Sequence, residues 1–534
     1  MDRRAGLGRS LGEGNGMRPG PRSRFDPLRR ALLGRASALA VLPWLDGAAA
    51  YAALRDAPRA ALVIGNAAYP RAMLDNPVND ATAIAAALGG LGFSVDRRLD
   101  VGHQSMIDAI GDFCAKVQHT QSVALFYFAG HGMQIDWRNY LLPVDVRLAR
   151  VDDVIRQSVD VATLLAGLGK ANNPMSVVIL DACRDNPFGV AGKSGGGLSQ
   201  MDAPPRTLLA YATAPGNVAS DGDGRNGLYT ENLLKEIGRA GVQIEDVFKR
   251  VRLSVRQRSQ GRQIPWESTS LEDDFFFVPP PDVHVPTQAE RDAAFGKDRD
   301  DWQAAQQVGT AQAIFAYLKS HPSGHFSEIA EATLDRLLAG QGEKPVKVQT
   351  SSQNPYSQGS EEAGRITLGD RYVYRFVDRL HQSERIFVHR VTRIDGERIE
   401  FNGGKFVTDL LGNPRREADG GVLGDNQLFA SEYSIGKEWI TRFDYMFPNG
   451  NVDVVELTCK VVARETIDVP AGRFDAFRVE ASGWRLYAPS RRVRTYWVAP
   501  GKVPRFIALD TVNYDRHGVV AASERRELMS FTKT

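Results

Sequence analysis

The sequence predicts an α/β fold, a mostly parallel six-stranded sheet with helices on both faces, followed by a helical hairpin and an antiparallel β domain. Three patterns support this prediction. Short apolar segments alternate with helical patterns over residues 58–278, which is typical of parallel strands joined by helical crossovers. Two helical patterns follow over 299–340. From residue 365, apolar and polar residues alternate with period two, which is typical of antiparallel strands with one solvated face.

Residues 1–52 have the pattern of an export signal. Basic residues that include Arg29 and Arg30 precede a moderately apolar segment at 31–45, and an alanine-rich stretch after it offers cleavage sites. The paired arginines predict the twin-arginine route, and therefore a periplasmic or secreted protein. The alternatives are a disordered basic tail or an uncleaved anchor. Met17 is an alternative start, which gives a signal peptide of more usual length.

The first folded domain, residues 58–278, contains the elements of the predicted sheet. Continuous apolar segments bounded by turn residues indicate strands that are buried on both faces. The predicted strands are 59–64, 93–99, 122–128, 176–180, 207–213 and 274–278. The predicted helices are 78–88, 104–117, 161–168, 228–237 and 244–257.

The remaining chain divides into two linkers and two domains. Residues 279–298 begin with three prolines, which cannot continue a strand ladder, and are predicted as a linker. Residues 299–340 form the predicted helical hairpin. Residues 341–364, rich in Gln, Ser and Pro, are a second predicted linker. Residues 365–534 form the antiparallel β domain, for which we expect a binding or targeting role with an unidentified partner.

Composition argues against several function classes. The 534 residues include 66 basic and 64 acidic side chains, a net charge of +2, so no positive field predicts nucleic-acid binding. Three cysteines are too few for a disulfide framework, and the patterns around Cys114 and Cys459 indicate core residues. After removal of the signal, no segment is long and apolar enough for us to expect a transmembrane span.

The strongest candidate site lies at the ends of two strands. The strand 122–128 runs into a Gly-His-Gly turn that contains His131, and the strand 176–180 runs into polar residues that contain Cys183. Open α/β sheets bind ligands at the carboxyl ends of their strands. We therefore expect His131 and Cys183 to lie close together, where the imidazole can take the proton of a nucleophilic thiol.

Gly132 completes this candidate site. Because it has no side chain, its N–H could point into the site beside that of Cys183 and stabilise an oxyanion. The alternatives are an inert core thiol for Cys183 and a structural turn residue for His131. The occurrence of both residues at strand ends, each in a short motif, favours a catalytic pair.

These motifs carry a family resemblance. Asp181-Ala-Cys-Arg-Asp185 is similar to the caspase nucleophile segment Gln-Ala-Cys-[Arg/Gln/Gly]-Gly, and His131 lies 52 residues upstream of Cys183. Residues from about 60 to 277 thus resemble the caspase/metacaspase clan, in its bacterial metacaspase-like branch. Asp181 replaces the caspase Gln, as in metacaspases, and Asp185 replaces the Gly. The resemblance implies a caspase-like fold and a cysteine endopeptidase with His131 as base and Cys183 as nucleophile.

The resemblance also implies polypeptide substrates with Arg or Lys at P1. In metacaspases, the positions that match Asp80 and Asp181 form an acidic S1 pocket. Two carboxylates in a closed pocket bind a guanidinium and repel an acidic side chain. The alternatives are a helix N-cap for Asp80 and a carboxylate bonded to its own turn for Asp181.

Two loops suggest processing and activation. The Gly-rich residues 189–206 lie where caspases are cut into two subunits, so self-cleavage after Lys193 or Arg206 is a hypothesis. Asp221 and Asp223 are candidate Ca²⁺ ligands, since metacaspases often need this ion as an activator. Their alternative role is turn formation. We expect no other metal or cofactor.

Two functions from different classes remain open from the sequence. The first is the exported cysteine endopeptidase. The second is a non-proteolytic, caspase-like scaffold that recruits partners through its C-terminal domains. In the β domain, residues 469–474 and 496–501 resemble segments of half-barrel domains of bacterial envelope proteins.

Overall fold

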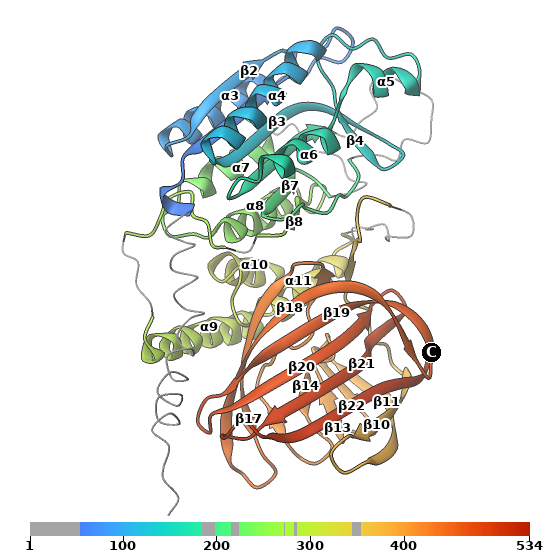
Figure 1. The fold of residues 1–534 in the computed structure, drawn as a ribbon. Helices are drawn as coiled ribbons and strands as arrows, with labels where there is room; N and C mark the ends of the chain where they lie inside the picture. Colours follow the sequence, from blue (N-terminus) through green and yellow to red (C-terminus); the bar gives the residue numbers. More distant parts are fainter. Residues whose placement is uncertain (1–53, 184–197, 215–223, 272, 282–285, 344–353) are drawn as a thin grey trace, which may run out of the picture. The chain divides into compact units, whose positions relative to one another are not determined.

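The computed structural model describes six parts of the chain: residues 54–183, 198–214, 224–271, 273–281, 286–343 and 354–534. The described residues belong to one compact unit. Within it, the α/β domain, a group of three helices and a closed β domain follow one another along the chain (Figure 1).

The α/β domain is built on a sheet with the strand order β2-β1-β3-β6-β7-β8. The first five of these strands are parallel to their neighbours, and β8 runs antiparallel to β7. The central strands are buried on both faces, as their continuous apolar sequences require. The strands are β1 (Arg59–Gly65), β2 (Ser94–Leu99), β3 (Val123–Ile135), β6 (Ser176–Cys183), β7 (Thr207–Tyr211) and β8 (Trp266–Thr269). This arrangement confirms the predicted fold class.

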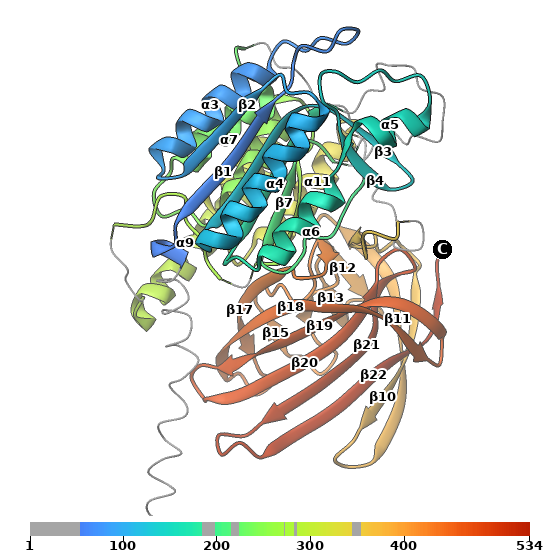
Figure 2. The same ribbon diagram turned by 45° about the horizontal axis from the view of Figure 1, so that its top comes forward.

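Helices cover both faces of this sheet (Figure 2). Side chains of α3, α7 and α8 pack on one face, and side chains of α4 and α6 pack on the other. The helices are α3 (Pro77–Gly90), α4 (His103–Thr120), α5 (Val151–Gln157), α6 (Val161–Ala171), α7 (Leu228–Ile237) and α8 (Ile244–Arg258). Beyond the parallel sheet, the end of β3 pairs with β4 (Arg138–Leu141), which pairs with β5 (Val159–Asp160).

The predicted strand at 274–278 is wrong. The last strand of the sheet is β8, and residues 276 and 278 form only isolated bridges. Phe275 and Phe277 are buried in the core beneath α7 and α8, with their rings edge to face at 5.5 Å. The continuous apolar run from Phe275 to Val278 imitates the pattern of a strand, although Phe275 and Phe277 are two aromatic anchors of a coil segment.

Three helices follow the α/β domain: α9 (Gln288–Val308), α10 (Ala311–Ser320) and α11 (Ser327–Gly340). The sequence pattern predicts a two-helix hairpin over 299–340, preceded by a linker over 279–298. Helix α9 begins inside that linker, because Thr287 and Glu290 form a reciprocal capping box. None of the helices in the described residues is long and apolar enough to cross a membrane.

The C-terminal domain is a twelve-stranded antiparallel sheet that closes on itself through the pairing of β10 with β22. The resemblance had suggested a half-barrel, whereas this sheet has no open edge. The strands are β10 (Arg371–Asp378), β11 (Ser383–Asp395), β12 (Arg398–Phe401), β13 (Phe406–Thr408), β14 (Pro414–Arg416), β15 (Val422–Leu423), β17 (Glu438–Met446), β18 (Val452–Val469), β19 (Gly472–Arg485), β20 (Ser490–Ala499), β21 (Val503–Tyr514) and β22 (Val520–Thr532).

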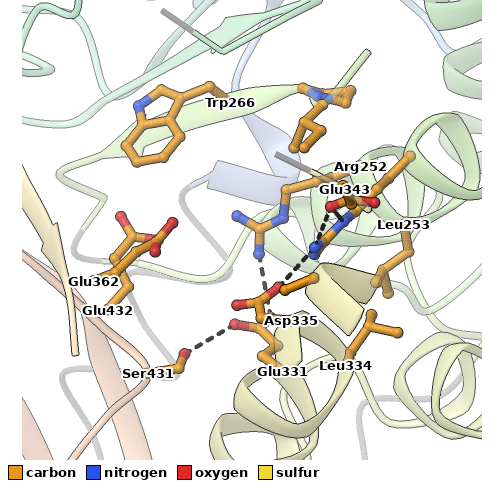
Figure 3. Close-up of a pocket in the computed structure, with 14 residues that line it drawn as sticks. Arg252, Leu253, Trp266, Glu331, Leu334, Asp335, Glu343, Glu362, Ser431 and Glu432 are labelled. Atoms are coloured by element: carbon orange, nitrogen blue, oxygen red, sulfur yellow. Dashed lines mark hydrogen bonds and ion pairs between the residues drawn. The ribbon is translucent and has the colours of Figure 1, made fainter. Parts of the chain in front are cut away.

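A small charged cavity of about 150 Å³ lies among α8, α11 and a separate two-stranded sheet (Figure 3). This sheet pairs β9 (Ser360–Glu362) with β16 (Glu432–Ser434). Arg252 of α8 forms ion pairs with Glu267 at 3.0 Å and with Glu331 of α11 at 3.3 Å. Strand β9 lies within residues 341–364, which the sequence predicts as a linker, so part of this stretch is a β-strand.

Candidate active site

His131 lies where β3 leaves the parallel sheet, and its surroundings fix both its backbone and its ring. The side chain is 3% exposed. Its backbone N–H donates to the Tyr69 hydroxyl at 3.1 Å, and that hydroxyl donates to the Leu142 carbonyl at 2.8 Å. The rings of Tyr69 and His131 lie 4.5 Å apart. Tyr69, in the loop that follows β1, therefore holds this part of β3 in place.

The second contact of His131 determines which ring nitrogen is basic. Its Nε2 lies 2.7 Å from the Ala72 carbonyl oxygen. Because a carbonyl oxygen can only accept, Nε2 carries the hydrogen of this bond, and Nδ1 is the basic nitrogen of the neutral ring. The carbonyl also orients the imidazole and stabilises it when it becomes positively charged.

Cys183 is the register partner of His131. Strands β3 and β6 are parallel neighbours, and their pairing runs from Ala124 opposite Ser176 to His131 opposite Cys183. Neighbouring strands lie about 4.8 Å apart, so the α-carbons of the two residues are side by side. The structure thus brings the predicted base and the predicted nucleophile to the same edge of the sheet.

Gly132 directs its N–H toward the β6 side of this edge. Leu142 of the β4 segment donates its N–H to the carbonyl of His131, and Gly132 is the register partner of Leu141. In an antiparallel ladder, this places the N–H of Gly132 on the side away from β4. A Cβ at position 132 would lie 2.9 Å from Leu198 Cδ2 and 3.0 Å from the Ala182 Cβ, so a side chain here would have to displace Leu198.

Asp181 is held by residues of two other elements. Its Oδ2 accepts hydrogen bonds from Tyr127 of β3 at 3.2 Å and from Thr230 of α7 at 2.7 Å. The Tyr127 and Thr230 hydroxyls are 2.6 Å apart. Asp181 therefore has hydrogen-bond partners on β3 and α7, beyond its own turn. Asp181 precedes Cys183 by two residues and has the same place in the strand pleat.

Asp80 lies in the first turn of α3 and is 3% exposed. The N-cap of α3 is Asn76, so the alternative N-cap role for Asp80 is wrong. Its Oδ1 accepts from Asn226 Nδ2 at 2.8 Å and from the Gly227 N–H at 3.0 Å. The close approach of α3 to the sheet requires Gly65, since a Cβ there would lie 2.4 Å from the Pro77 carbonyl oxygen.

The first turn of α7 connects the two carboxylates. Gly227, the N-cap of α7, donates to Asp80, and Thr230 donates to Asp181. Burial, followed by the charges of Asp181 and Asp80, raises the pKa of Tyr127 well above its usual value. Asp181 therefore contacts this buried hydroxyl directly, and the charge of Asp80 acts on it as well.

Several of these residues were missed in the sequence. Tyr69 follows a strand in an ordinary loop, and Thr230 lies in a helical pattern, so neither has a motif. Tyr127 is a polar-tipped residue in an apolar strand, which was the one available signal.

Lys193, Asp221 and Asp223 lie outside the described residues. The described residues contain no group of three or more His, Cys, Asp or Glu side chains arranged to hold a metal ion.

Comparison with known families matches residues 58–276 to the caspase-domain family model. The match covers the α/β domain from β1 to the segment after β8 and supports a cysteine-peptidase type of function for it. No curated protein sequence matches the chain significantly.

Proposed function

We propose that this protein, whose residues 58–276 are a caspase-like domain, is a cysteine endopeptidase that cleaves polypeptides after Arg or Lys. The observation that carries the proposal is the register pairing of His131 with Cys183 on the parallel strands β3 and β6. A thiol and an imidazole on adjacent strand ends are the two groups that acyl transfer to sulfur needs.

In the proposed mechanism, Nδ1 of His131 takes the proton of the Cys183 thiol, and the thiolate attacks the scissile carbonyl carbon. The N–H groups of Gly132 and Cys183 stabilise the oxyanion of the tetrahedral intermediate. His131 then gives its proton to the leaving amine, and an acyl-enzyme remains on sulfur. Water, deprotonated by the same nitrogen, hydrolyses this thioester and restores the thiol.

The proposed specificity depends on Asp80 and Asp181. Their carboxylates lie on the side of the sheet edge covered by α3 and α7, and each is oriented by donors from α7 or its N-cap. Fixed carboxylates in a partly dry site favour a guanidinium or ammonium at P1. The same charges repel aspartate, so we propose basic rather than acidic specificity.

Self-processing is proposed at Lys193 rather than at Arg206. The N–H of Arg206 donates to the Ser270 carbonyl at 3.1 Å, and the Arg206 carbonyl accepts from the Ser176 N–H at 2.9 Å. A protease binds its substrate in an extended form and needs these backbone groups. The Arg206–Thr207 bond is therefore a poor substrate unless the edge of the sheet opens.

A peptide assay tests the proposal. Purified protein is incubated with fluorogenic peptides that end in Arg, Lys or Asp, with and without Ca²⁺. We expect turnover of the Arg and Lys peptides, and its loss in His131→Ala and Cys183→Ala. Cys114→Ala, which changes a half-buried thiol on α4, is the matched control and keeps activity. Absence of turnover with all peptides would favour the scaffold function.

Export is a separate part of the proposal. The signal pattern in residues 1–52 is the basis for a periplasmic or secreted location. Cell fractionation with mass spectrometry of the mature N-terminus tests it. Replacement of Arg29 and Arg30 by lysine should retain the protein in the cytoplasm; unchanged export would argue against the twin-arginine route.

A further inference from the structure

The closed β domain contains a cavity of about 360 Å³ that is separate from the candidate active site. All residues that line it lie between Phe376 and Arg526, inside the closed sheet. This volume lies within the range of small-molecule binding sites in proteins. Neither the family match nor the proposed peptidase function assigns it a role.

One half of the cavity wall is apolar and aromatic. Phe429, Phe443 and Phe506 are each less than 9% exposed and line the cavity with Leu428 and Tyr496. The rings of Phe429 and Phe506 stack at 6.0 Å, and the Tyr496 ring packs edge to face against Phe429. This half offers a dry surface to an acyl or aryl group.

The other half of the wall is rich in arginine. Arg492 and Arg494 alternate with Tyr496 along β20, so the pleat directs the three side chains into the cavity. The cavity-lining charged residues are Arg385, Arg485, Arg492, Arg494, Arg505, Arg526, Glu417, Asp419 and Glu524. The lining therefore has six arginines and three carboxylates.

The strand register places most of this charge toward one end of the cavity. Tyr496 pairs with Leu509, which pairs with Arg526. One inward position further toward the start of β20, Arg494 pairs with Thr511, which pairs with Glu524. The aromatic part lies in the other direction from Tyr496, where Val498 pairs with Phe506. It contains one buried arginine, Arg505, whose guanidinium lies 5.4 Å from the centre of the Phe506 ring. The cavity thus has a mainly aromatic part near Phe506 and an arginine-rich part toward the start of β20.

The positive charge in the arginine-rich part is only partly balanced by the protein. Arg485 pairs with Asp453 at 2.6 Å, and Arg526 lies 3.8 Å from Glu524. The Arg494 side chain forms no ion pair or hydrogen bond with any residue that the structure describes, and its Nε is buried. The charge of Glu417 acts on it only from a distance. A buried charge without a partner is costly, and a bound anion would remove this cost.

The electrostatics of the lining agree with this interpretation. Burial, followed by the positive charges of Arg485 and Arg494, lowers the pKa of Arg492 to about 10. Burial also lowers the pKa of Arg494, although Glu417 opposes the effect. These arginines stay charged at neutral pH and repel one another, so an anion between them would be stabilised.

We propose that this cavity binds an amphiphilic anion, with an acyl chain against Phe429 and Phe506 and a carboxylate or phosphate head at Arg492, Arg494 and Arg526. Arginine suits such a head because its planar guanidinium binds carboxylate and phosphate oxygens in pairs. The proposal is independent of the peptidase activity, since no residue of the candidate active site lines the cavity.

Calorimetric titration of the full-length protein tests the proposal with four probes, all below their micelle concentrations. Dodecanoate and dodecyl phosphate have both chain and anion, dodecyltrimethylammonium has the chain with a cation, and acetate has the anion alone. We expect the two chain-bearing anions to bind at least tenfold more tightly than the other two. Comparable binding of the cation or of acetate, or no binding of either chain-bearing anion, would overturn the proposal.

Two variants locate the binding. Arg494→Gln should weaken dodecanoate binding at least about tenfold, since it removes a charge-assisted contact. Arg491→Gln, on the same strand but exposed, is the matched control and should bind like the unmodified protein. Equal affinity of the two variants would overturn the proposal.

A third variant fills the cavity and retains its charges. Leu509→Trp enlarges a side chain of the lining and should abolish binding while Arg494 remains. Circular dichroism confirms that each variant is folded. Undiminished binding to a folded Leu509→Trp protein would place the ligand outside the cavity.

Discussion

Glu362 and Glu432 are register partners in the sheet of β9 and β16, so two carboxylates lie opposite each other at the edge of a charged cavity (Figure 3). Like charges in direct cross-strand positions destabilise a sheet. Desolvation, followed by the charges of Asp335 and Glu432, raises the pKa of Glu362 from 4.5 to about 7. The protonated form of Glu362 is therefore the one that the folded protein favours.

The first prediction concerns the pH dependence of stability. A carboxyl group with a raised pKa contributes stability that is fully present below about pH 4.5 and is lost as the pH rises through about 7. Glu362→Gln imitates the protonated group, so it should raise the urea midpoint at pH 8 but not at pH 5. The gain is at most about 1 kcal/mol, because the side chain is exposed and water screens its charge.

A neighbouring variant provides the contrast. Glu361 accepts hydrogen bonds from Arg464 at 2.7 Å and from the Gly501 N–H at 3.0 Å, so Glu361→Gln should lower the midpoint at pH 8. If Glu362→Gln stabilised the protein equally at both pH values, the effect would not come from its ionisation.

The second prediction concerns the packing at Gly132. A methyl group at this position would lie too close to Leu198 Cδ2 and to the Ala182 Cβ. Gly132→Ala should therefore reduce the free energy of unfolding by about 1–3 kcal/mol. In a double-mutant cycle with Leu198→Ala, which removes the closer contact, the two losses should be less than additive. Strict additivity would show that the leucine does not restrict this position.

The third prediction concerns specificity. Asp181→Asn and Asp80→Asn keep the shape of each side chain and remove its charge. Each should lower kcat/KM at least about tenfold for Arg and Lys peptides, while peptides with a neutral P1 residue change little. Thr230→Val removes a hydroxyl that donates to Asp181 and contacts Tyr127 but leaves both carboxylates in place, so it should have a smaller effect. A uniform loss with all peptides would mean that the aspartates are structural.

The fourth prediction concerns self-processing. Mass spectrometry of fragments from active protein should find a new N-terminus after Lys193, which Lys193→Ala removes. Arg206→Ala is the control and should leave the cut unchanged, because the backbone of Arg206 is bonded to Ser176 and Ser270. Cys183→Ala should give one intact chain. A fragment that begins at Thr207 would contradict this prediction.

The sequence was most informative about the parallel sheet. Apolar strands that end abruptly in polar residues predict both a parallel sheet and the edge of it where those polar residues meet. The proximity of His131 and Cys183 could therefore be predicted. Continuous apolar sequences indicate strands that are buried on both faces, which is typical of a parallel sheet. The catalytic roles of the two residues stay a prediction.

Other features could not be read from local patterns. The orientation of Asp181 depends on Tyr127 and Thr230, which are 54 and 49 residues away in the chain. Closure of the β domain depends on the pairing of its first strand with its last, which no local alternation encodes. The start of α9, by contrast, has a local signal in the sequence, since Thr287 and Glu290 have the spacing of a capping box. The prolines before it favoured the interpretation of this stretch as a linker.

The pairing of β6 with β7 has a consequence for any chain cut between them. Five consecutive residues of each strand, from Ser176 opposite Thr207 to Leu180 opposite Tyr211, form a parallel ladder in the middle of the sheet. Hydrolysis of the intervening segment would leave both pieces interlocked through this ladder and the helices packed over it. The nicked protein should migrate as one particle in gel filtration and separate into two chains only in denaturant.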